Sequence, residues 1–216
     1  MIRVHVMVEG QTEETFVRDL LYDHFQGRSV FLNPILLRTS AQGKGGVVRY
    51  AKVRPQIVRQ CRQDSAAVVT TLIDLYRLPG DFPGSQTCVV TDVYAKVRCL
   101  EQALADDVDC RNFLPNLSVH EFEALLFSDL DQFSAWFDEA AMKRLHAQIP
   151  KDRTPEEIND GVDTAPSKRI IAALAGDGYQ KTLHGPLIAM DIGLASMRQR
   201  CPHFHAWLKQ LEALAP

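Results

Sequence analysis

The residues best suited to chemistry are acids that follow apolar segments of the chain. Five of them lie at or just after the ends of three such segments: Glu9, Glu13, Asp74, Glu121 and Glu123. Carboxylates gathered at one place repel one another and lose hydration, so they persist mainly where a divalent cation offsets both costs. Mg²⁺, or Mn²⁺ in its place, is the hard cation that carboxylate oxygens favour. The pattern therefore predicts a metal site.

Spacing decides which of these acids can share an ion. Glu9 and Glu13 are about one helical turn apart, so both can face the same ion, whereas Glu121 and Glu123 share a side only in an extended segment. Structural alternatives remain open. Glu13 can simply complement a helix dipole, and Asp74 can cap a loop.

Two further residues beside these acids have equally open roles. His120 precedes Glu121 and is either a metal ligand or a hydrogen-bonded structural imidazole. Tyr76 lies two residues after Asp74 and can simply pack against the proline-containing loop that follows. The sequence does not decide between these interpretations.

Strands are expected to position the acids. Residues 2–8 alternate apolar and polar side chains, and residues 66–73 form a continuous β-branched run that is typical of a strand buried on both faces. Residues 112–119 predict another strand, and residues 31–37 predict one that Pro34 weakens, which indicates an edge position or a bulge. In open sheets, sites form beyond the carboxyl ends of the strands, where the acids stand.

Helices are expected between these strands. Apolar spacing predicts them over residues 12–25, 47–63 and 89–104, with Pro55 breaking or kinking the second, and over the short segment 124–127. This alternation predicts an α/β fold, a mainly parallel sheet flanked by helices on both faces.

The end of the chain shows a different pattern. After about residue 128 only short helices are expected, so we divide the 216 residues into a core, 1–128, and a helical extension, 129–216, packed on that core as one structural domain. With 46% hydrophobic and 24% charged residues, the composition excludes long disorder and coiled coils.

Charge is distributed unevenly, although the net charge is only −3. Residues 38–62 contain seven bases and no acid, whereas residues 101–163 contain fifteen acids and five bases. A basic arm beside a carboxylate-rich region suits a metal-dependent enzyme that acts on a polyanion. Its candidate nucleic-acid-binding residues are Lys44, Arg49, Lys52, Arg54, Arg59 and Arg62. The alternative is two solvated faces of opposite sign.

The cysteines and the chain start bear on the cell compartment. Five cysteines, odd in number and never in a CxxC pair, suggest neither a disulfide framework nor a structural zinc site, and we expect buried thiols. No apolar run is long enough for a membrane span or a signal peptide. A cytoplasmic protein without membrane contact is expected.

Six segments together resemble the DUF4276 family. They occur in order across nearly the whole chain: residues 8–14, 74–79, 119–127, 155–159, 165–169 and 201–204. That family is similar to Toprim proteins, which include the nuclease domains of topoisomerases, primases and overcoming-lysogenization-defect nucleases. The resemblance implies a Toprim-like core, a metal-dependent nuclease, an ATPase partner and a role in phage defence.

The resemblance also implies roles for individual residues. Glu9 and Glu13 match the glutamate and helical acid of Toprim enzymes, and Glu9 can act there as general base or acid. Asp74 matches the first aspartate of an Asp-x-Asp pair, but Tyr76 replaces the second, so Glu121 and Glu123 would supply the missing charge. A lysine completes related sites by stabilising phosphate charge. Lys168, after Ser167 at a helix start, is the first candidate, and Lys181 is the second.

These features predict Mg²⁺- or Mn²⁺-dependent hydrolysis of phosphodiester bonds in DNA or RNA. Two alternatives remain: a non-catalytic metal-binding partner or regulatory subunit of an ATPase, and a small-molecule phosphatase. A nuclease needs both the acids and the basic stretch, and a phosphatase needs only the acids. Whether the chain forms a homo-oligomer is left open.

Overall fold

A parallel sheet of five strands forms the centre of the molecule. The computed structural model describes residues 1–38, 49–158, 161 and 163–215. The strands are β1 (Ile2–Val8), β2 (Val30–Leu36), β3 (Val68–Asp74), β4 (Phe113–Leu114) and β5 (Leu117–Ser118). Their order is β2-β1-β3-β4, with β5 also paired to β3, and every pairing is parallel. The expected α/β class is therefore confirmed, as is the edge position of β2.

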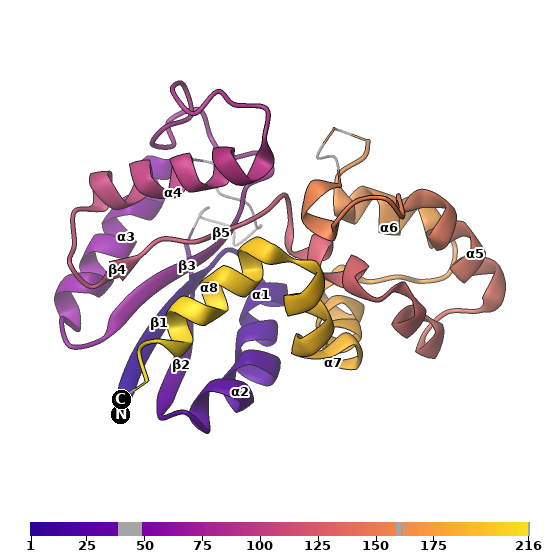
Figure 1. The fold of residues 1–216 in the computed structure, drawn as a ribbon, viewed down its shortest axis with the longest axis horizontal. Coiled ribbons are helices and arrows are strands. Elements are labelled where there is room, and N and C mark those ends of the chain that lie inside the picture. The colour runs from indigo at the N-terminus through magenta and orange to yellow at the C-terminus, as the bar shows by residue number, and fades with distance from the viewer. Residues whose placement is uncertain (39–48, 159–160, 162, 216) are drawn as a thin grey trace.

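Helices cover both faces of this sheet (Figure 1). After β1 come α1 (Gln11–Phe16), the π-helical turn η1 (Val17–Leu21) and α2 (Tyr22–Gln26). These lie on one face, and α3 (Tyr50–Gln63) and α4 (Val93–Val108) lie on the other. Among the described residues, no helix combines the length and the apolar character that crossing a membrane requires.

The remaining helices follow the last strand. They are η2 (Phe122–Ser128), η3 (Leu130–Ala135), α5 (Glu139–Gln148), η4 (Pro155–Glu157), α6 (Pro166–Ala173), α7 (Lys181–Arg200) and α8 (Pro202–Glu212). Figure 1 shows α5 and α6 to the side of the sheet, while α8 returns across the face that α1 and α2 also cover.

Side-chain alternation in β1 divides the apolar residues between two cores. Val4, Val6 and Val8 face the core beneath α1 and α8, whereas Met7 faces the core beneath α3 and α4. Successive strand residues point to opposite faces, so a strand covered on both faces is apolar on both. Burial of these side chains supplies the main driving force for docking the helices.

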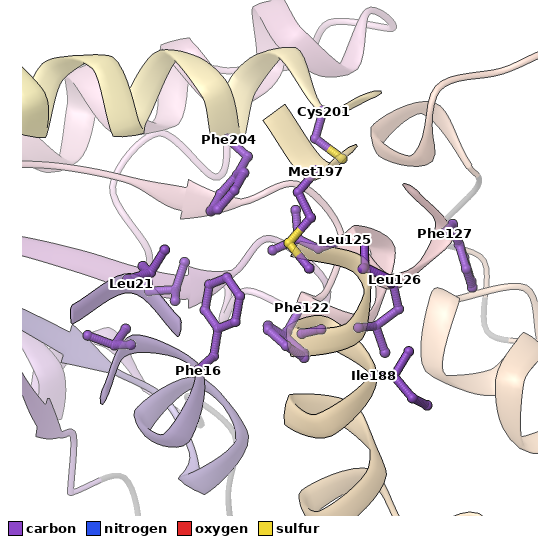
Figure 2. Close-up of a cluster of buried hydrophobic side chains, with 14 of the residues drawn as sticks. Phe16, Leu21, Phe122, Leu125, Leu126, Phe127, Ile188, Met197, Cys201 and Phe204 are labelled. Carbon is purple, nitrogen blue, oxygen red and sulfur yellow. The ribbon is translucent and has the colours of Figure 1, made fainter. Parts of the chain in front are cut away.

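The first core joins the beginning of the chain to its end. Figure 2 shows Phe16 of α1, Phe122 of η2, Ile188 of α7 and Phe204 of α8 in one cluster. The rings of Phe16 and Phe122 pack edge to face with their centroids 5.1 Å apart. Residues beyond 128 thus share a core with the sheet.

The strand expected over residues 112–119 is interrupted. Two short strands, β4 and β5, replace it, because Pro115 has no N–H to donate to the ladder. Asn116 fills the gap: its side-chain amide donates to Thr71 O at 3.1 Å, and its N–H donates to Thr71 Oγ1 at 3.1 Å. The break still leaves β5 beside β3, with Ile73 opposite Leu117.

Of the break or kink expected at Pro55, the break does not occur, because α3 continues through this residue. Two other local expectations need correction. The helix expected from residue 89 begins only at Val93, because the Asp92 side chain accepts a hydrogen bond from Ala95 N and caps it. Cys88 and Cys99 form a disulfide, so the expectation of thiols only was wrong for these two. Cys61, Cys110 and Cys201 are free.

The strand order places a switch point between β1 and β3. From β1 the chain crosses to β2 on one side, and from β3 it continues to β4 on the other, with covering helices on opposite faces. Connections that diverge in this way leave a crevice at the carboxyl ends of the two strands. Glu9 directly follows β1, and Asp74 is the last residue of β3.

Candidate active site

Glu9 and Asp74 meet at this switch point. The Asp74 N–H donates to Glu9 Oε2 at 3.3 Å, and Asp74 Oδ1 accepts from Phe122 N at 3.1 Å. Asp74 therefore also fixes the first residue of η2, in keeping with the capping role left open from the sequence. Burial and the negative charges of Glu9 and Glu13 raise the pKa of the Asp74 carboxyl well above its usual value.

Glu13 joins these two acids from the first turn of α1, where it is only 3% exposed. Burial raises the pKa of its carboxyl, and the charge of Lys181 partly offsets that effect. Gly10 leaves the space that this carboxylate occupies, since a Cβ added there would stand 3.0 Å from Glu13 Oε2.

The segment after β5 carries two further acids inward. His120 has a left-handed φ of 65°, a conformation that is uncommon for a residue with a side chain, and its O accepts from Tyr76 N at 2.7 Å. The turn places Glu121 and Glu123 in the buried interior, where they are 7% and 0% exposed. A buried carboxylate is stable only if a partner compensates it.

Each of these two acids has such a partner. Glu121 accepts from Ser167 N and Ser167 Oγ, both at 2.9 Å, at the beginning of α6. Glu123 Oε1 lies 3.0 Å from Lys181 Nζ at the beginning of α7. Burial raises the pKa of Glu123 to about 7, although the charge of Lys181 acts to lower it.

Lys181 is the cation of this acidic cluster, which we define as Glu9, Glu13, Asp74, Glu121 and Glu123. Burial acts to lower the pKa of its ammonium, but the charges of Glu123, Asp74 and Glu13 outweigh that effect and raise it. Lys168, our first candidate, is exposed on α6, and no contact joins it to the acidic cluster within the described residues. The order of the two lysines is therefore corrected.

Tyr179 is a residue of this site that the sequence did not reveal. Its ring stacks on His184 with centroids 5.7 Å apart. Its hydroxyl is buried with no hydrogen-bond partner in the described part of the chain, and the nearby charge of Glu123 adds to burial in raising its pKa. No local pattern marks this tyrosine, because only long-range packing brings it to the acids.

Tyr76, the replacement for the second aspartate, carries no charge to the site. Its ring lies beneath the Arg77 guanidinium, 5.1 Å from ring centroid to Cζ. Its hydroxyl is also buried and without a hydrogen-bond partner among the described residues.

The donor chemistry of the acidic cluster suits Mg²⁺ or Mn²⁺, because each of its five members offers carboxylate oxygens. Glu123 Oε2 and the Tyr179 hydroxyl are buried without hydrogen-bond partners in the described chain, so the site has polar capacity that a hydrated ion would use. However, no three His, Cys, Asp or Glu side chains in that part of the chain are arranged to hold a metal ion together. An ion would therefore have to draw neighbouring carboxylates closer.

The basic arm lies apart from the acidic cluster. Arg49, Lys52, Arg59 and Arg62 are exposed on or beside α3, on the opposite face of the sheet from α1 and α7. Arg54 is already engaged in part, because its Nε donates to Asp107 Oδ2 at 2.6 Å. Lys44 lies outside the described residues.

Fold and site together define a doubly wound α/β protein with an acidic cluster and one lysine at its switch point. The chain belongs to DUF4276, a family described as a domain of unknown function, whose model matches residues 8–212. Searches of curated proteins and of solved structures found no match.

Proposed function

We propose that this protein hydrolyses phosphodiester bonds in DNA or RNA with the help of Mg²⁺ or Mn²⁺. One observation carries the proposal: Glu9, Glu13 and Asp74 share an electrostatic site at the carboxyl ends of β1 and β3, together with Lys181. A buried excess of carboxylates over cations is costly for a purely structural site, and a divalent ion would relieve that cost.

Glu9, Glu13 and Asp74 are the residues that would hold the ion. When bound, the ion would lower the pKa of a water molecule and offset charge on the phosphate. The protein's own groups would do the rest. As an alternative to holding the ion, Glu9 would accept or return a proton, and the Lys181 ammonium would offset charge developing on the phosphate. Ser167 and Phe122 N hold Glu121 and Asp74 in place through their hydrogen bonds.

The test is cleavage of circular DNA, linear DNA and RNA by the purified protein with Mg²⁺, Mn²⁺ or EDTA. Glu9→Gln and Asp74→Asn should each lower a metal-dependent rate by at least about 10²-fold, the contribution typical of a positioned acid or base. Glu14→Gln is the matched control, because Glu14 neighbours Glu13 in α1 but is not part of the acidic cluster. Cleavage that survives both site variants, or that persists in EDTA, would refute the proposal.

A second candidate is a non-catalytic subunit that binds an ATPase. The observation that favours it is the Lys181–Glu123 ion pair, because an ammonium that neutralises the acids from within reduces the need for a metal. If no substrate is cut by any form of the protein and Mg²⁺ binding is undetectable by calorimetry, this candidate is preferred. Mg²⁺ binding that Asp74→Asn abolishes would favour the first.

A further inference from the structure

The outer face of α3 carries a basic concavity. Its volume is about 470 Å³, and it is lined by Arg54, Pro55, Val58, Arg59, Arg62 and Gln63. Positions 54, 58 and 62 are four residues apart, as are positions 55, 59 and 63, so the two rows lie side by side as one stripe along the helix. The helix contains no acidic residue at all. The concavity is therefore lined by both apolar and basic side chains, and we call its arginines, Arg54, Arg59 and Arg62, the rim.

Arg59 and Arg62 leave their charge available on this rim. Both are exposed, and neither forms an ion pair or a side-chain hydrogen bond within the described residues. Arg54 differs, because the Asp107 carboxylate and the Asp107 carbonyl oxygen both accept hydrogen bonds from its guanidinium. Asp64, the residue directly after the helix, is occupied by Arg3 at 2.8 Å. Among the described residues, acidic side chains thus form no ion pair with Arg59 or Arg62.

This rim lies near the amino-terminal ends of the strands, whereas the acidic cluster lies at their carboxyl ends. Asp64, directly after α3, contacts Arg3 and His5 near the beginning of β1, whereas Glu9 follows its end. The seven residues of β1 span about 20 Å at roughly 3.3 Å per residue. A small phosphate ester bound at the acids would not reach Arg59 or Arg62, but a polymer would.

We propose that the outer face of α3 holds the phosphate backbone of a double-stranded nucleic acid, apart from the acidic cluster. Guanidinium groups suit phosphate oxygens because their planar forks donate two hydrogen bonds at once. Arg59 and Arg62 are three residues apart, about 4.5 Å along the helix at 1.5 Å per residue, which corresponds to one to two base-pair steps of roughly 3.4 Å.

The absence of stacking groups is the reason for choosing a duplex. Proteins that hold single strands without sequence preference stack the bases on exposed aromatic side chains. The only aromatic residue of α3 is Tyr50, which is 5% exposed and donates its hydroxyl hydrogen to Asp107. The surface therefore offers charge and no stacking platform. Duplex binding by α3 does not depend on the proposed function. The inference rests on that function only in taking the bound duplex to be the substrate of the acidic cluster.

The test is the salt dependence of duplex binding, measured by fluorescence anisotropy in EDTA so that no cleavage occurs. Compared with the unmodified protein, the double variant Arg59→Ala/Arg62→Ala should lower the slope of log K against log salt by about 2, roughly one per lost phosphate contact. Arg18→Ala is the control, since Arg18 is also exposed but lies on η1 and pairs with Asp19. Arg59→Lys/Arg62→Lys should keep the slope, because lysine keeps the charge.

The inference is overturned if the double alanine variant binds the duplex with an unchanged slope, if the unmodified protein binds no duplex, or if it binds single strands more tightly than duplexes. Both side chains are exposed, so an unchanged unfolding temperature should accompany the lost affinity. Arginine-dependent binding without cleavage would refute only the proposed nuclease, whereas cleavage that ignores both arginines would refute only the docking surface.

Discussion

Removing the Lys181 ammonium tests whether it is the cation that stabilises the acidic cluster. Lys181 Nζ lies 3.0 Å from Oε1 of its partner Glu123. The Glu123 side chain is fully buried, whereas the Lys181 side chain is 38% exposed. Breaking a buried ion pair costs about 3–5 kcal/mol, because the remaining charge is left uncompensated. Water reaches part of Lys181, so we expect Lys181→Met to lower the free energy of unfolding by about 2–3 kcal/mol. For a chain of this size, that is a fall of roughly 4–12 °C in the unfolding temperature.

The assay is a double-mutant cycle, followed by circular dichroism in EDTA at a pH above the Glu123 pKa of about 7. It compares Lys181→Met, Glu123→Gln and the double variant, with Lys168→Met as the exposed control. The double variant should regain at least about 1 kcal/mol relative to the sum of the single changes, because it leaves no unpaired charge. The reasoning fails if Lys181→Met stays within about 0.5 kcal/mol of the unmodified protein, or if the two changes are additive.

Two further predictions concern stability away from the site. Hydrogen bonds from Arg198 lower the pKa of Glu212 to about 2. Its carboxylate therefore stabilises the fold at a pH above its unfolded-state pKa of about 4.3, and this contribution is lost as the pH falls toward 2. Glu212→Gln should therefore lower the free energy of unfolding, measured by urea titration, by about 1–2 kcal/mol at neutral pH and by almost nothing near pH 2. An equal loss at the two pH values would contradict this prediction. Gly84→Ala should cost more than about 1 kcal/mol, because φ is +80° and its Cβ would lie 2.9 Å from Cys88 Sγ. Gly27→Ala, with φ at −62° and open space around it, should be neutral or stabilising in the same thermal scans, and similar losses for both would refute this account.

The sequence was sufficient to predict the sheet and the acids at its edge. β1 and β3 are long and largely apolar, Glu9 directly follows β1, and Asp74 ends β3, so local patterning alone marks both the strands and the acids at their ends. Parallel pairing then brings Glu9 and Asp74 together without any further information. The break between β4 and β5 was harder to foresee, because Asn116 replaces ladder bonds only through its contacts with Thr71.

The partners of the acids were less predictable. Ser167 and Lys168 look alike in sequence, as polar residues at a helix start, yet only Ser167 faces the acidic cluster, where it donates to Glu121. Lys181 also begins a helix, but it reaches Glu123 because α7 packs against η2 and α1. Packing between segments far apart in sequence decides which helix start lies beside a given strand end. The apolar spacing of a helix carries no information on this long-range packing.

The contacts at the acids also determine what each part of the chain contributes. Glu9, Glu13, Asp74, Glu121 and Glu123 all come from the first 128 residues, whereas Ser167 and Lys181, which compensate Glu121 and Glu123, come from the helices that follow. Because buried carboxylates without partners are costly, residues 1–128 alone would leave two acids uncompensated in the interior. The C-terminal helices are therefore part of the site as well as part of the core, and the division of the chain near residue 128 separates acids from the groups that stabilise them.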